Sequence, residues 1–284
     1  NLKEPFNGLF TQGMVCHETY KDNDNNWVSP DEIETINGKK YLKKDKKKII
    51  NVGPSESMSK SKKNTIDPED IFLNYGADAA RLFILSDSPP EKDVQWSEEG
   101  ISSSYKFIQK LWNLNTKILE KIKKGHDENE DKELERETNK FLKKIKENLE
   151  NFSYNKIIAN LHEIHTFLVK QIDKKYNKET IIENYKKILI SIMPVIPHFS
   201  NESLEMLNVK NVEWPNYDLS LINEDKINIV IQINGKKRGL IKTIPNITEE
   251  NLLKIIKKEQ ALKKYIDNVN IKRNFRIPFI GITG

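Results

Sequence analysis

The chain has 284 residues, enough for two or three domains, and its 37% hydrophobic and 31% charged residues indicate a folded core under a strongly polar surface. The formal net charge is only +5, so the positions of the lysines matter more than their number. The single cysteine, Cys16, excludes a disulfide within the chain and leaves no cysteine cluster for a metal, and the absence of an apolar run near the ~20 residues of a membrane span favours a cytoplasmic protein without membrane contact.

Residues 21–48 are the polar part of a first region, residues 1–97, whose apolar runs are short. Asn37-Gly38 is typical of a two-residue hairpin turn, so the sequence predicts a surface insertion with a small hairpin. We interpret the run from Lys39 to Lys48 as a solvated face in preference to a binding patch. After it, Ile49–Val52 predicts a short strand that Gly53-Pro54 ends.

The stretch SESMSKSKKN, residues 55–64, combines four serines and three lysines with one apolar side chain, Met58. A mobile loop with hydroxyl and ammonium donors can close over a polyphosphate and stabilise the charge that grows during phosphoryl or nucleotidyl transfer. An ordinary Ser/Lys linker is the alternative, and composition alone favours it.

Two short helices are predicted after this stretch. Asp67 can accept hydrogen bonds from the first turn of a helix, and Pro68 suits the first helical position. Gly76 can end this helix, and Ser88-Pro89-Pro90 breaks the second one, on which Arg81 is expected to be a structural ion-pair partner. The predicted inward faces are Ile71, Phe72 and Tyr75 in the first helix and Ala80, Phe83 and Ile84 in the second.

Residues 98–222 have helical periodicity and predict an antiparallel bundle of four helices joined by polar links. Pro194 and Pro197 end the fourth helix. The four apolar stripes are Ile101, Tyr105, Ile108, Trp112, Asn115, Leu119 and Ile122; Leu134, Phe141, Ile145 and Leu149; Tyr154, Ile157, Ile158, Leu161, Ile164, Leu168 and Ile172; and Ile181, Tyr185, Ile188, Leu189 and Ile192.

Residues 223–284 change to the alternating period of strands and predict a small α+β domain of ββαβ type. A strand with isoleucine at every second position from Ile227 is followed by a turn at Asn234-Gly235 and a second strand from Lys236 to Ile244. Thr248 predicts the cap of a helix that runs to about Asp267, and residues 269–282 are strand-like again.

Several motifs, taken together and in order, resemble a known family. The loop sequence SMSKS, residues 57–61, resembles the KMSKS signature of class I aminoacyl-tRNA synthetases, with Ser57 in place of the first lysine. The runs EPFNGLFTQGM, NTIDPED, YGADAAR, VQWS and INGKKRG resemble bacterial leucyl-tRNA synthetases, so that the resemblance covers nearly the entire chain. This context favours a synthetase loop over a linker.

The resemblance implies an ATP site at this loop and an RNA contact near the C-terminus. Lys60 is then the catalytic residue that contacts the phosphates, and Lys62 adds charge that Ser57 does not supply. The implied ATP contacts are Ser57, Met58, Ser59, Lys60, Ser61 and Lys62. The implied tRNA contacts are Lys236, Lys237 and Arg238 at a hairpin tip, for which a solubilising turn is the alternative.

The implied fold class is multidomain α/β plus α. Residues 1–97 would be the C-terminal end of a Rossmann-like catalytic domain, residues 98–222 an anticodon-binding-type helix bundle, and residues 223–284 a tRNA-binding domain. The implied reaction attaches leucine to tRNA(Leu) through leucyl-adenylate, with ATP as substrate and Mg²⁺ assisting the phosphates. Because a HIGH-like motif and an editing domain are absent from the sequence, we expect the C-terminal portion of a longer, monomeric synthetase that is inactive alone.

Two alternatives remain open. A valine, isoleucine or methionine synthetase would share the loop, although Trp96 favours the leucine enzymes within the class. A stand-alone tRNA-binding module would contain the same basic residues without any catalysis.

Overall fold

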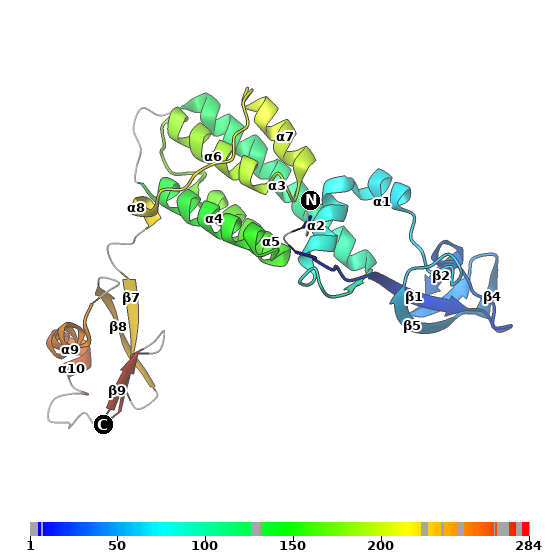
Figure 1. The fold of residues 1–284 in the computed structure, drawn as a ribbon, viewed down its shortest axis with the longest axis horizontal. Helices are drawn as coiled ribbons and strands as arrows, with labels where there is room; N and C mark the ends of the chain where they lie inside the picture. Colours follow the sequence, from blue (N-terminus) through cyan, green and yellow to red (C-terminus); the bar gives the residue numbers. More distant parts are fainter. Residues whose placement is uncertain are drawn as a thin grey trace. The chain divides into compact units, whose positions relative to one another are not determined.

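The computed structural model of the chain describes residues 5–6, 8–125, 132–222, 227–233, 236–243, 247–263, 265, 273–276 and 280–283 (Figure 1). These residues form two compact units, of which the first ends at Tyr217 and the second begins at Asp218. The predicted division of the first unit between residues 97 and 98 remains a prediction. Within the ranges given above, no helix is both long enough and apolar enough to cross a membrane.

A three-stranded sheet in the order β5-β1-β6 lies in the first unit (Figure 1). β1 (Val15–Lys21) pairs antiparallel with β5 (Asn51–Ser57) and parallel with β6 (Val94–Gln95). The prediction that Gly53-Pro54 ends the strand was wrong, because β5 continues through Pro54 to Ser57. Since β5 is at the edge of this sheet, a proline without a backbone donor can remain within it.

The polar insertion folds as a three-stranded antiparallel sheet and not as a single hairpin. Asn37 and Gly38 join β2 (Ile33–Ile36) to β3 (Lys39–Leu42) with φ angles of 50° and 77°, which confirms the predicted turn. β4 (Asp45–Ile49) follows after a second tight turn at Lys43-Lys44. This turn was not predicted, because it contains no glycine. A single turn of 3-10 helix, η1 (Pro30–Glu32), leads into β2.

Two short helices follow the loop as predicted. In α1 (Pro68–Tyr75), the Asp67 side chain accepts a hydrogen bond from the Glu69 amide at 2.9 Å, so the predicted cap is confirmed. The predicted inward faces are only partly correct, because Phe72 of α1 is 51% exposed. In α2 (Ala77–Ser86) the buried residues are Asp78, Ala79, Leu82 and Phe83.

All four predicted helices of the bundle are present and lie alongside one another in Figure 1. They are α3 (Glu98–Lys124), α4 (Glu133–Glu150), α5 (Tyr154–Gln171) and α6 (Lys178–Ile192). A fifth helix, α7 (Pro197–Met206), begins at the second predicted stop and packs on α6. Buried residues of these helices and of α1 and α2 form one continuous hydrophobic core.

The predicted apolar stripe of α6 was correct. All five residues named for α6 are buried. In α3, by contrast, Tyr105, Trp112 and Leu119 are only partly buried, and the sequence analysis missed a second buried row. α3 contacts α2, α5, α6 and α7, so one stripe could not describe it. The missed residues are Phe107, Leu111, Leu114 and Ile118.

Asp78 and Arg81 of α2 hold the corner between α6 and α7. The Asp78 carboxylate, 7% exposed, accepts hydrogen bonds from the amides of His198 at 3.2 Å and Phe199 at 2.7 Å, which are otherwise free at the start of α7. Arg81 donates to the carbonyl oxygens of Pro194 at 2.6 Å and Val195 at 3.0 Å. Arg81 is therefore structural, but it binds these backbone carbonyls and not the expected carboxylate.

The second unit contains a four-stranded sheet in the order β8-β7-β10-β9. β7 (Ile227–Ile233) and β8 (Lys236–Thr243) pair antiparallel as predicted, and the turn predicted at Asn234-Gly235 lies outside the described residues. The expected single terminal strand is two strands, β9 (Arg273–Arg276) and β10 (Ile280–Thr283), with Pro278 between them in the sequence.

A helical segment packs on this sheet. α8 (Leu219–Ile222) begins the unit, and α9 (Glu249–Lys258) is capped by Thr248 as predicted. The helix expected to reach Asp267 is interrupted, because Glu259 is extended and a separate turn, α10 (Gln260–Lys263), follows. The core of this unit is built from Ile229, Ile231, Ile233, Ile241, Ile247, Leu252, Ile256 and Leu262.

The hydrogen bonds that Asp78 accepts predict a loss of stability when its carboxylate is removed. We expect Asp78→Ala to lower the free energy of unfolding by about 2–3 kcal/mol, because the buried amide of Phe199 and the partly buried amide of His198 lose a charged acceptor. Urea denaturation of the 284-residue chain, followed by circular dichroism, measures the change. Asp87→Ala, at an exposed position on the end of α2, is the matched control. Equal stabilities of the two variants would contradict the assigned role of Asp78.

Candidate functional site

The SMSKS segment is a short, anchored turn between β5 and α1. Ser57 is the last residue of β5 and lies opposite Cys16 of β1, and the Met58 amide donates to the Val15 carbonyl at 3.1 Å. The turn covers residues 60–63 and is closed by a hydrogen bond from the Lys63 amide to the Lys60 carbonyl at 3.3 Å. The loop therefore begins on a strand and has a defined resting conformation.

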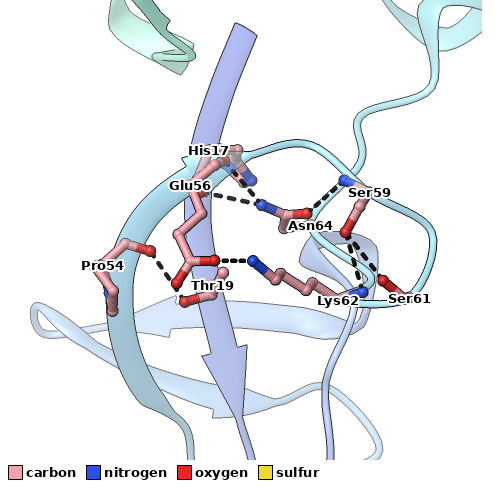
Figure 2. A network of polar contacts seen from close by, with 8 residues as sticks. All are labelled: His17, Thr19, Pro54, Glu56, Ser59, Ser61, Lys62 and Asn64. Carbon is pink, nitrogen blue, oxygen red and sulfur yellow. Dashed lines mark hydrogen bonds and ion pairs between the residues drawn. The ribbon is translucent and has the colours of Figure 1, made fainter. Parts of the chain in front are cut away.

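Asn64 holds this turn against the sheet, as Figure 2 shows. Its side chain is fully buried, and its amide nitrogen donates to the carbonyls of His17 and Glu56, each at 3.2 Å. Its amide oxygen accepts from the Ser59 amide at 2.9 Å. One side chain thus joins β1, β5 and the loop. The role of Asn64 was not predicted: the residue begins the NTIDPED run, but nothing in that run indicates that its side chain is buried against β1 and β5.

The serines of the loop support the turn from within. The Ser59 hydroxyl accepts from the Lys62 amide at 3.4 Å and lies 3.3 Å from the Ser61 hydroxyl (Figure 2). Ser59 is partly buried, whereas Ser57 and Ser61 are exposed. Small hydroxyls are therefore used here first to shape the backbone.

The two lysines predicted to bind ATP are in different situations. The Lys62 ammonium forms an ion pair with Glu56 of β5, and both side chains are about one-third exposed (Figure 2). Lys60 is exposed, and among the residues described no carboxylate forms an ion pair with its ammonium. Of the two, Lys60 is the one that remains available to a ligand.

Lys60 borders two adjoining pockets. One, of about 500 Å³, is lined by Ser29, Asp31, Glu32, Lys43, Lys44, Lys60, Lys63 and Thr65. The other, of about 750 Å³, shares Ser29, Asp31, Lys60 and Thr65 and extends to α1 and the start of α3. Both volumes are in the range of roughly 300–1,000 Å³ that small-molecule sites occupy. No group of three or more His, Cys, Asp or Glu residues that could hold a metal occurs in the described part of the chain.

Met58, the apolar residue of the loop, faces a separate apolar pocket of about 410 Å³. Ile71 of α1, Ile84 of α2 and Trp96 also line it. Trp96 packs edge-on against Phe83 with ring centroids 5.3 Å apart, and its indole nitrogen donates to Glu98 at 3.1 Å. Met58 therefore lies beside apolar side chains at the start of the loop.

Charged side chains of β1 and β3 form a network beside the loop. The Lys40 ammonium donates to the Glu18 carboxylate at 2.5 Å, and this hydrogen bond holds the pKa of Glu18 below its ordinary value. The Tyr20 hydroxyl donates to the same carboxylate at 2.9 Å. Burial of the His17 ring lowers the pKa of this histidine, so it is neutral at pH 7. Lys40 is thus already engaged within the protein.

The basic residues predicted to contact tRNA belong to the second unit. Lys236 and Lys237 open β8 and are exposed. Arg238 is exposed too, but its guanidinium lies over the Tyr265 ring, 4.5 Å from the centroid. Lys236 and Lys237 are therefore the freer cations of the three.

Two protein-family models match the chain. Residues 131–257 match the anticodon-binding domain of tRNA ligase, a range that starts within the bundle and continues to the end of α9. Residues 46–97 match the model for tRNA synthetases class I (I, L, M and V), a range that includes the SMSKS turn and both short helices.

Curated relatives extend the similarity to almost the whole chain. The leucine--tRNA ligase of Zymomonas mobilis is 36% identical over 282 residues, which are 98% of this chain and 32% of the relative. The leucine--tRNA ligase of Orientia tsutsugamushi is 39% identical over 285 residues, 98% of this chain and 33% of the relative. The chain spans about a third of the length of these relatives.

A solved structure shares the fold. It is the ternary complex of LeuRS, tRNA and LeuAMS from Agrobacterium radiobacter K84, with a TM-score of 0.67 and 21% sequence identity. The match covers 80% of this chain and 30% of that one. At this identity the likeness supports the class I synthetase fold for the chain and no more.

The hydrogen bonds of the buried Asn64 side chain predict how resistant the turn is to proteolysis. We expect trypsin to cleave Asn64→Ala after the loop lysines about tenfold faster, because losing roughly 1.5 kcal/mol of hydrogen bonding raises the open population by that factor. Timed digestion followed by mass spectrometry locates the cuts. Asn74→Ala, at an exposed position on α1, is the control. Unchanged cleavage in Asn64→Ala would show that Asn64 does not hold the turn.

Proposed function

The chain is homologous to leucine--tRNA ligases over nearly its whole length, and on that premise we propose that it forms part of an enzyme that attaches leucine to tRNA(Leu). A carboxylate oxygen of leucine would attack the α-phosphorus of ATP, and the bond to the departing pyrophosphate would break. A hydroxyl of the terminal ribose of the tRNA would then attack the leucyl carbonyl carbon of leucyl-adenylate, and AMP would leave. Mg²⁺ would enter with the phosphates of ATP as part of the substrate.

The observation that carries this proposal is the position of Lys60. It is exposed on a turn that Asn64 fixes to the sheet, and it borders two pockets large enough for a nucleotide. Negative charge grows on the pyrophosphate as it leaves, and an ammonium placed beforehand stabilises that charge most where water is excluded. Lys60 is therefore the proposed catalytic residue.

The other loop residues have supporting roles in this proposal. Ser57, Met58, Ser59, Ser61 and Lys62 complete the ATP-contacting segment, and the ion pair with Glu56 holds Lys62 on one side of it. Residues up to 97 would be the end of the catalytic domain. The leucine pocket would belong to the part of the enzyme beyond this chain, since the chain spans about a third of its relatives. The chain by itself would not form leucyl-adenylate.

The remaining regions would bind tRNA. The family match of residues 131–257 supports an RNA-binding role for the bundle and for the start of the second unit. In the second unit, Lys236 and Lys237 are the proposed phosphate contacts, with Arg238 held beside them on Tyr265. The whole enzyme would act as a monomer in the cytoplasm.

The Lys60 assignment is tested in the complete enzyme. We expect Lys60→Ala to slow leucine-dependent exchange of pyrophosphate into ATP about 10²- to 10³-fold, the usual effect of removing one preplaced donor, with little loss of stability. Lys47→Ala, at an exposed position on β4 that lines neither pocket, is the control. Normal exchange by Lys60→Ala would refute the role. Exchange that needs valine, isoleucine or methionine instead of leucine would refute the substrate.

The RNA contact is tested on the 284-residue chain. We expect Lys236→Ala/Lys237→Ala to weaken tRNA(Leu) binding and to reduce the salt dependence of the affinity by about two phosphate contacts. Filter binding at several salt concentrations measures the affinity for tRNA(Leu) and its dependence on salt. Lys257→Ala/Lys258→Ala removes two exposed lysines from the end of α9 and is the matched control. An equal loss in both variants would indicate unspecific attraction and overturn the assignment.

A further inference from the structure

The second turn of the polar insertion presents two lysines to the loop pocket. Lys43 and Lys44 are the two residues between β3 and β4, where Leu42 pairs with Asp45. The Lys43 amide donates to the Glu32 carbonyl at 2.8 Å, so the backbone of this turn is fixed. Both side chains are exposed and line the pocket of about 500 Å³ that Lys60 also lines.

Two anchored turns therefore supply cations to one pocket. Lys43 and Lys44 come from the insertion, and Lys60 and Lys63 come from the SMSKS turn, which Asn64 fixes. The acidic residues of the lining are Asp31 and Glu32, and the Lys44–Glu32 pair is loose, with 3.8 Å between its charged atoms and a Lys44 side chain that is 82% exposed. Four ammonium groups against two carboxylates leave a net positive pocket with the hydroxyls of Ser29 and Thr65 in its wall.

Two other lysines of the run 39–48, Lys40 and Lys46, bind carboxylates outside the pocket. Lys40 binds Glu18 and lies over the Tyr20 ring, and Lys46 pairs with Glu34 at 2.9 Å. The lysines of this run are therefore not equivalent, because Lys43 and Lys44 line the pocket and the other lysines of the run do not.

We propose that Lys43 and Lys44 form, with Lys60 and Lys63, a binding site for a compact polyphosphate. This inference rests on the proposed function in that the polyphosphate would be the triphosphate of ATP or the departing pyrophosphate. The insertion then supplies the second wall of the phosphate site. Lysines from two turns that line one pocket suit a compact anion. An RNA backbone would be bound by positive side chains spread over a longer surface.

The direct test uses the 284-residue chain and tripolyphosphate as the probe. We expect calorimetric titration to detect binding, and Lys43→Ala/Lys44→Ala to weaken it about five- to tenfold, the effect of losing two partly solvated charge contacts. Lys47→Ala/Lys48→Ala removes two exposed lysines of β4 that do not line the pocket, and it should bind as the unaltered chain does. Circular dichroism verifies that both variants fold. No binding by the unaltered chain, or equal losses in both variants, would overturn the proposal.

Two further measurements separate this inference from its rivals. In the complete enzyme, Lys43→Ala/Lys44→Ala is expected to raise the KM for ATP in pyrophosphate exchange and to leave the KM for leucine unchanged. If the complete enzyme shows no leucine-dependent pyrophosphate exchange while the tripolyphosphate result stands, the proposed function fails and the phosphate site survives. If a short single-stranded RNA loses affinity for Lys43→Ala/Lys44→Ala and tripolyphosphate does not, the ligand is RNA and the proposal is wrong.

Discussion

A buried polar group must find its hydrogen-bond partners inside the protein, and the loop region is organised by that constraint at Asn64. Its side-chain amide has no exposed surface, and it satisfies backbone groups of β1, β5 and the loop itself. β1, which is distant in sequence, is therefore held in one position relative to β5 and the loop. The positions of Lys60 and Lys63 depend on this arrangement, since neither forms an ion pair within the described part of the chain.

The same constraint acts at the far side of the short helices. Asp78 and Arg81 stand one turn apart on α2 and bind backbone groups on both sides of the α6–α7 corner. The segment from β5 to α2 is thus fixed to the sheet at one end and to the bundle at the other. A shift of the α6–α7 corner would move α2, and through α1 it would act on the end of the loop.

Turns and helix caps that depend on adjacent residues were predicted correctly. Features that depend on contacts with distant segments were not. The Asn37-Gly38 turn and the Asp67 cap depend on a few adjacent residues, and both were predicted correctly. The path of β5 through Pro54 depends on its being an edge strand, which no local pattern reveals. In the loop, Lys60 was singled out by its motif, but the pairing of Lys62 with Glu56 and the role of Asn64 needed β1 and β5 beside them.

Ser57 ends β5 opposite Cys16, at the place where the signature that the loop resembles has a lysine. Every cation of this loop consequently stands on the turn, and none stands on the sheet. A lysine at that position would extend from a paired strand, whereas these lysines extend from a turn that Asn64 holds. Their long side chains lose rotamer freedom when they bind an anion, and this entropy cost opposes binding more strongly as temperature rises, so anion binding by this loop would weaken with warming.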